Sequence, residues 1–235
     1  MKRSLCGFMM IVMLAAMIMG TALAAGKLSV VQEKFIVMPY ITYHAGYVYA
    51  EVKNVGDKPV EFDGGLLEMY DKEGNSIEST NWIGCYPEVL GAGETGYAYA
   101  YQSVEAATET SFIDDYLLTI TGKGAKGRST VYLPVTNKQY LEVKDPYYSY
   151  SNISADLENT TDATVRDFYI AFALKDADGK LLYVTSCQPS YVGIMPGSSV
   201  EILTRVDSAI TEYFTANNII PTTVEAIAYI TLEAE

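Results

Sequence analysis

The chain has few of the residues on which most catalytic and metal sites depend. Its 235 residues include one histidine, His44, and one tryptophan, Trp82. A Ser-His-Asp or Cys-His arrangement would have to use His44, which lies in the polar segment YHAGY just before an expected strand. A structural zinc site needs about four Cys or His ligands close together. We therefore expect no catalytic residues, no metal site and no cofactor.

Cysteine is too sparse for a disulfide framework. Of the three cysteines, Cys6 lies near the N-terminus, so Cys85 and Cys187 are the two in the rest of the chain. Small exported domains held by disulfides carry many more. Each of the two precedes an x-Pro pair, and pairing them would require their Cα atoms to lie within about 7 Å. We expect two free thiols, each buried in its own domain as a small apolar side chain.

Long hydrophobic runs are missing outside the N-terminal segment. Lys2 and Arg3 precede an apolar stretch from Leu5 to Met19, and Ala22-Leu23-Ala24 offers small residues for cleavage. The apolar stretch is short for a membrane-spanning helix, which needs roughly 20 residues. The pattern predicts a signal peptide over residues 1–24, cleaved after Ala24, and a secreted or cell-envelope-associated protein without membrane insertion afterwards.

Basic residues are scarce in what remains. Without Lys2 and Arg3 the chain has 14 basic and 29 acidic residues, a net charge of −15. Such a surface repels phosphate groups, so nucleic acid is excluded as a partner. The loop GKGAKGRS at 122–129 has the glycines of a phosphate loop, but a strand-like segment follows where a helix is needed. Its cations could contact an anionic partner, although a solvated hairpin loop is the commoner arrangement.

One sequence unit occurs twice, about 105 residues apart. When Asn54 is placed over Asn159, both copies run without a gap to a glycine in a polar turn. The identical pairs are Asn54/Asn159, Asp57/Asp162, Val60/Val165, Asp71/Asp176 and Gly74/Gly179. Cys85 and Cys187 follow at matching places. A period this long is typical of domain duplication rather than of a solenoid. We expect domains at residues 25–135 and 136–235, with a linker near Pro134–Lys138.

Both copies have the chemistry of short antiparallel strands. Tyr47, Tyr49 and Glu51 alternate with small apolar residues, the period of two that a half-buried strand requires. Polar and glycine-containing turns separate such runs. These patterns predict an all-β fold of two tandem Ig-like antiparallel β-sandwiches. One short helix is expected in the second domain, over residues 208–218, capped by Asp207 and crossing between strands.

The repeated strand resembles the FxLYD motif. The first copy reads Leu67-Glu68-Met69-Tyr70-Asp71 and the second Phe172-Ala173-Leu174-Lys175-Asp176. The second copy has the Phe and Leu of the motif but Lys175 in place of Tyr, while the first has Tyr70 but differs at the two apolar positions. The resemblance implies small Ig-like domains of exported prokaryotic proteins, often in tandem, with no known catalytic residues.

Two further local patterns could carry chemistry. Asp176-Ala177-Asp178-Gly179 begins like a calcium loop, but Lys180 stands at the fifth position and Cys187 at the twelfth, where oxygen ligands are required. Asp114 and Asp115 could serve a hydrolase that acts on carbohydrate, although neighbours on a strand point to opposite faces.

Tyrosine is unusually abundant, with 20 copies, many of them in clusters such as YITYHAGYVY, YAYAY and YYSY. Tyrosine favours strands and pairs across them, but its flat ring with a polar tip also suits ligand contacts. We therefore expect a non-catalytic interaction module that binds a protein or a glycan at the cell surface. The candidate binding residues are Trp82, Tyr86, Tyr97, Tyr99 and Tyr101. A carbohydrate hydrolase and a structural spacer without a ligand are the alternatives.

Overall fold

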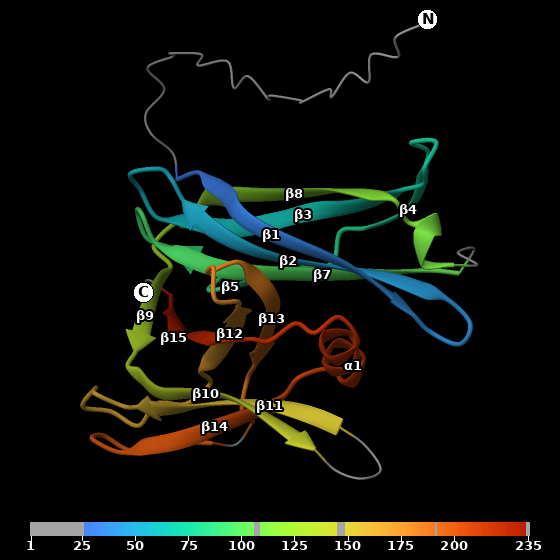
Figure 1. Ribbon diagram of the computed structural model, residues 1–235. Helices are drawn as coiled ribbons and strands as arrows, with labels where there is room; N and C mark the ends of the chain where they lie inside the picture. Colours follow the sequence, from blue (N-terminus) through green and yellow to red (C-terminus); the bar gives the residue numbers. More distant parts are fainter. Residues whose placement is uncertain (1–25, 106–108, 145–148, 191, 234–235) are drawn as a thin grey trace, which may run out of the picture.

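The structure is a computed structural model that describes residues 26–105, 109–144, 149–190 and 192–233. The expected signal peptide therefore lies outside the described residues. Figure 1 shows four layers of strands stacked from top to bottom, with the labelled helix beside the lower two. The prediction of an all-β fold built from antiparallel sheets is confirmed.

The first sandwich contains the upper two layers in Figure 1. Its sheet A has the strand order β1-β2-β7-β5, and in sheet B the central β3 pairs with β8 along one edge and with β4 and β6 along the other. The bounds are β1 Leu28–Pro39, β2 His44–Asn54, β3 Val60–Tyr70, β4 Ser76–Thr80, β5 Ile83–Tyr86, β6 Val89–Leu90, β7 Thr95–Val104 and β8 Asp115–Gly124, with a 3-10 turn, η1, at Thr110–Phe112.

The second sandwich contains the lower two layers. Its sheet C has the order β13-β12-β15-β9 and its sheet D the order β10-β11-β14. The bounds are β9 Ser129–Leu133, β10 Val135–Lys144, β11 Ser149–Glu158, β12 Tyr169–Lys175, β13 Leu181–Cys187, β14 Ser199–Arg205, α1 Ser208–Ala216 and β15 Thr223–Leu232.

The alternating pattern of β2 sets which face each side chain occupies. Val48, Ala50 and Val52 are buried in the core between sheets A and B. Tyr49 and the other residues of the opposite phase point away from that core, as a period of two requires. The outer face of sheet A is therefore rich in tyrosine, and the second sandwich packs against it.

The boundary between the sandwiches lies earlier than the sequence suggested. β9 falls within the range assigned to the first domain, but it pairs with β15 of the second sandwich from Leu133–Ala228 to Ser129–Leu232. The turn at residues 125–128 therefore joins the sandwiches, and the segment expected as a linker is mostly the start of β10. That strand carries a bulge between Thr136 and Gln139, which interrupts its pairing with β11.

The two sandwiches share a topology, as the repeat predicts. The order β1-β2-β7 corresponds to β10-β11-β14, and β4-β3-β8 corresponds to β13-β12-β15. Asn54 and Asn159 are buried at equivalent places in the two copies. Asn54 is the last residue of β2, and Asn159 directly follows the end of β11. The side-chain amide of Asn54 donates to the backbone oxygens of Lys58, Leu90 and Gly91, and that of Asn159 donates to those of Ala163 and Ile194.

The repeated Asp-x-x-Gly turn is structural in both copies. Asp71 Oδ1 accepts from the backbone nitrogens of Glu73 and Asn75, and Asp176 Oδ1 accepts from those of Asp178 and Lys180. The glycines have φ angles of +79° at Gly74 and +76° at Gly179, a region that costs other residues a steric clash. This is a hairpin turn rather than a calcium loop.

The predicted helix is present as α1, which connects β14 of sheet D to β15 of sheet C. Asp207 caps it by accepting from the Ala209 nitrogen at 2.8 Å. Ile210 and Phe214 are buried against the second core. No helix among the described residues has both the length and the apolar character needed to cross a membrane.

Candidate ligand-binding groove

A charged cluster links the sandwiches where sheet A of the first packs on sheet C of the second, a contact that we call the seam. Lys175, which is 8% exposed, places its Nζ 2.8 Å from Glu51 Oε2 and 3.0 Å from Glu225 Oε2. The Tyr97 hydroxyl donates a hydrogen bond to the Glu225 carboxylate. Glu51 and Tyr97 come from sheet A, whereas Lys175 and Glu225 come from sheet C, so this network ties one sandwich to the other.

The pKa values at the seam favour the ionised pair. Burial alone would lower the pKa of Lys175, but hydrogen bonds to Glu51 and Glu225 raise it overall. Burial likewise tends to raise the pKa of Glu225, but hydrogen bonds from Tyr97 and Lys175 lower it overall. Both groups are therefore charged over a wide range around neutral pH.

Tyrosines from neighbouring strands form a ladder on the outer face of sheet A. Tyr47 of β2 pairs with Tyr101 of β7, and their rings stack with centroids 5.6 Å apart. Tyr49 pairs with Tyr99 in the same way along the backbone. Trp82 adds an edge-to-face contact with Tyr101 at 6.3 Å. The register of β2 against β7 therefore turns two alternating sequences into one aromatic surface.

These tyrosines, together with residues of the second sandwich, line a groove of about 390 Å³. Tyr49 and Tyr183 form a buried edge-to-face pair with ring centroids 5.1 Å apart, one from each sandwich. Tyr101, 48% exposed, is accessible along the same groove. The remaining lining residues are Tyr43, Tyr47, Tyr99, Val184, Thr185 and Asp207. A groove of this size, lined by aromatic rings with a few polar groups, has the features of a small-ligand site.

The groove is neutral except for one carboxylate. Burial raises the pKa of Tyr47 and Tyr49, and the Asp207 charge raises both further, so the hydroxyls stay protonated. Burial also raises the pKa of Tyr183, against hydrogen bonds from the Thr185 side chain and the Asp207 backbone. Among the described residues that line the groove, Asp207 is the one with a full charge.

The predicted binding residues divide between the seam and the groove. Tyr97 is 2% exposed and hydrogen-bonded to Glu225, so it has no surface for a ligand, and its assignment to a binding surface is wrong. Tyr86 is half-buried, with its ring 5.9 Å from Tyr99 and 6.4 Å from Tyr169 of the second sandwich. It belongs to the seam as well.

The other three predicted residues lie together. Tyr99 and Tyr101 line the groove, and Trp82, 62% exposed, stands beside Tyr101. Sequence reasoning missed Tyr43, Tyr47, Tyr49, Tyr183 and Asp207 as partners of this surface. The clustering of tyrosine just before and within β2 is the sequence signal for Tyr43, Tyr47 and Tyr49. Tyr183 and Asp207 belong to the other sandwich, and no sequence pattern connects them with this surface.

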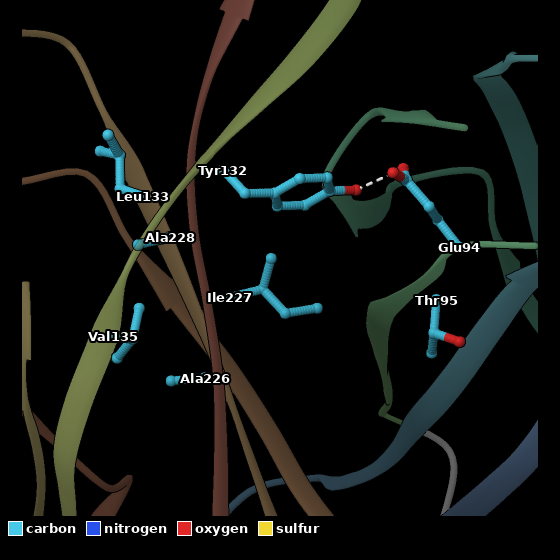
Figure 2. A pocket seen from close by; sticks show the side chains of 8 residues that line it. All are labelled: Glu94, Thr95, Tyr132, Leu133, Val135, Ala226, Ile227 and Ala228. Atoms are coloured by element: carbon cyan, nitrogen blue, oxygen red, sulfur yellow. Dashed lines mark hydrogen bonds between the residues drawn. The ribbon is translucent and has the colours of Figure 1, made fainter. Parts of the chain in front are cut away.

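A second hollow, of about 320 Å³, lies where β9 and β15 approach the start of β7. Figure 2 shows its eight lining side chains, most of them small or aliphatic, with the Tyr132 hydroxyl pointing at the Glu94 carboxylate. Tyr132 donates to Glu94 at 2.5 Å, and the Gly91 nitrogen donates to the same oxygen at 2.6 Å. This carboxylate is therefore occupied in joining the sandwiches.

The acidic pair of the hydrolase alternative lies in a third hollow. Asp114 and Asp115 line it together with Asp71, beside the hairpin turn. The Asp71 carboxylate accepts hydrogen bonds from Asn75 and Glu73, and the Asn75 bonds are the main cause of its lowered pKa. A general acid needs a raised pKa, so Asp71 is suited to the turn and not to that role.

The basic loop and the cysteines have local roles. Lys123 Nζ lies 2.7 Å from Asp63 Oδ1, and Arg128 pairs with Glu61 and, at 3.2 Å, with Glu88. The loop is a connection between the sandwiches rather than a hairpin, because β8 pairs with β3 and β9 with β15. Cys85 is buried and Cys187 half-buried, both as free thiols. No group of three or more potential metal ligands occurs in the described parts of the chain.

Comparisons with known proteins add little to this geometry. No family model matches the chain, and no curated protein sequence matches it, so the FxLYD resemblance stays a prediction. Among solved structures, the chain is similar to a β-glucuronidase of Parabacteroides merdae determined with glycerol in its active site. The identity is 11%, the match covers 73% of this chain and 25% of that one, and the TM-score is 0.19. A score this low carries no argument about function.

Proposed function

We propose that the protein is an exported, non-catalytic interaction module that binds a glycan in the tyrosine groove between its two sandwiches. The observation that carries the proposal is the stacked pair of half-buried Tyr47 and exposed Tyr101, extended by exposed Trp82. A pyranose ring has a flat face of C–H groups and a rim of hydroxyls. Parallel aromatic rings match that face, while their hydroxyls and Asp207 can bond the rim.

A preorganised groove supports this proposal. Its walls come from β2, β7 and β13, and the Lys175 cluster fixes the sandwiches relative to each other. Rigid aromatic side chains also lose little conformational entropy when a ligand binds. A protein ligand is the other class considered, but nine residues line this groove, whereas a stable protein interface uses about 20–30 residues on each side.

The test is binding of the chain from residue 25 onward to an array of oligosaccharides, followed by titration calorimetry with the best ligand. We expect Tyr101→Ala and Trp82→Ala each to weaken binding about tenfold, as loss of a stacking side chain does. Tyr70→Ala is the matched control, because Tyr70 is a partly exposed tyrosine on the outer face of the first sandwich, away from the groove and from the second sandwich.

Two results would count against the proposal. One is the absence of any glycan that binds. The other is a glycan whose affinity is the same for wild type, Tyr101→Ala and Trp82→Ala, since that ligand would bind elsewhere. Far-UV circular dichroism of each variant establishes that the sandwiches are folded.

A further inference from the structure

The groove also contains a carboxylate, that of Asp207, which takes no part in the stacking of the aromatic rings. Asp207 lines the groove together with the tyrosines, and its Oδ1 accepts from the Ala209 nitrogen to cap α1. The carboxylate is exposed, so it can meet both the helix and a ligand. The positive N-terminus of the helix is thus already matched by a negative group, and the groove is not an anion site.

Two features of the groove attract a cation. The faces of tyrosine rings carry negative electrostatic potential, and a cation within about 6 Å of a ring centroid is attracted to them. The Asp207 carboxylate adds a full negative charge beside Tyr47, Tyr49 and Tyr183. The described lining includes no lysine or arginine that would oppose this charge.

The charge of the whole chain acts in the same direction. After the expected cleavage the net charge is −15, so an anionic ligand would be repelled on approach and a cationic one attracted. Two of the three basic side chains in the loop at 122–128 are already paired, Lys123 with Asp63 and Arg128 with Glu61 and Glu88.

From this complementarity we infer that the glycan bound in the groove carries protonated amino groups, as oligosaccharides of unacetylated amino sugars do, with one ammonium group placed against Asp207. This inference rests on the proposed function and specifies its ligand class. The sugar rings stack on Tyr47 and Tyr101, and the ammonium group donates to the carboxylate oxygen that does not cap the helix.

The experiment compares β-linked glucosamine oligomers with N-acetylglucosamine oligomers of equal length, in which each protonated amino group is replaced by a neutral acetamide. Both are titrated into wild type, Asp207→Asn and Tyr101→Ala slightly below neutral pH, at low and at raised salt. Asparagine is as good a helix cap as aspartate, so Asp207→Asn removes the charge while keeping α1. Glu201→Gln is the control, because Glu201 is an exposed acid on sheet D, away from the groove.

We expect the glucosamine oligomer to bind wild type about tenfold more tightly, and Asp207→Asn to remove most of that preference. Raised salt should weaken the glucosamine complex and leave the acetylated one nearly unchanged. Glu201→Gln should behave as wild type, and Tyr101→Ala should weaken both ligands.

Each other outcome overturns the inference, and the outcomes separate it from the proposed function. Equal affinity for the two oligomers, with both weakened by Tyr101→Ala, refutes the cation and leaves a glycan-binding groove. Tight binding of an acidic oligosaccharide does the same. Binding of basic peptides with no glycan bound at all refutes both.

Discussion

The ammonium group of Lys175 lies 2.8 Å from the carboxylate of Glu51, across the seam between two sandwiches that share one topology. Lys175 occupies the position that Tyr70 holds in the first copy of the repeated strand. Tyr70 faces the outside of the first sandwich and is partly exposed, whereas Lys175 is buried against sheet A. The difference between the copies therefore marks the contact between them.

Replacing Lys175 tests how much this contact stabilises the protein. Lys175→Met keeps the length of the side chain but leaves Glu51 and Glu225 without their cation. Breaking a buried ion pair from one side is strongly destabilising, and since Glu225 is partly exposed we expect a loss of about 2–3 kcal/mol in the free energy of unfolding. Urea denaturation followed by circular dichroism measures it.

Lys180→Met is the control for this substitution, because Lys180 is an exposed lysine on the hairpin turn of the same sandwich. It should change the free energy of unfolding by less than about 0.5 kcal/mol. If Lys175→Met is as mild as this control, the seam cluster is not a stabilising contact.

The same cluster predicts a loss of stability in acid. The pKa of Glu225 in the folded state lies below its ordinary value of 4.5. The folded protein therefore binds fewer protons than the unfolded chain, so this contribution is full above the unfolded pKa and disappears as the pH falls through the folded one. Unfolding of wild type and Glu225→Gln should be compared from about pH 3 to about pH 7.

Wild type should exceed Glu225→Gln in stability at neutral pH, and the gap should close towards the acid end. The raised pKa of Lys175 does not affect this range, since its contribution is complete below 10.5 and is lost only as the pH rises beyond that value. A gap that stays constant with pH would show that the carboxylate acts through packing alone.

Local patterns were enough to predict much of the fold. The alternation in β2, the polar turn at Asp71 and the cap at Asp207 each depend on a few consecutive residues, and each lies where the sequence placed it. The repeat also placed Asn54 and Asn159 at equivalent positions of the two copies. Such features follow from backbone conformation and burial, which short segments determine.

The candidate groove could be predicted only in part, because it depends on pairing between distant segments. The sequence shows that tyrosines alternate in β2 and β7, but not that Tyr47 lies opposite Tyr101. It also does not show that Tyr183, from the other sandwich, packs on Tyr49. Tyr97 was misread for the same reason, since its alternation matches that of Tyr99 and Tyr101 and only the second sandwich makes it buried.

The thiols offer a further prediction. Burial raises the pKa of Cys85 to about 12 and that of Cys187 to about 11. The thiolate is the reactive form, so both should react slowly with a chromogenic disulfide reagent at about pH 8 while the protein is folded. In denaturant both should react at once. A mass two hydrogens lower in the mature monomer without reductant would instead show a disulfide.

The two buried asparagines should be the most sensitive polar positions in the chain. Asn54 Oδ1 accepts from the backbone nitrogens of Lys27 and Gly56, and its amide donates to three backbone oxygens. Alanine leaves these buried and part-buried backbone groups without their side-chain partner, so Asn54→Ala should cost about 2–4 kcal/mol. Asn159→Ala should cost a similar amount, because the amide of Asn159 has the equivalent partners in the second sandwich.

Asn81→Ala is the control, since Asn81 is exposed. Thermal unfolding of the three variants measures the effect, and a cost for only one of the two buried positions would contradict the equivalence of the repeats.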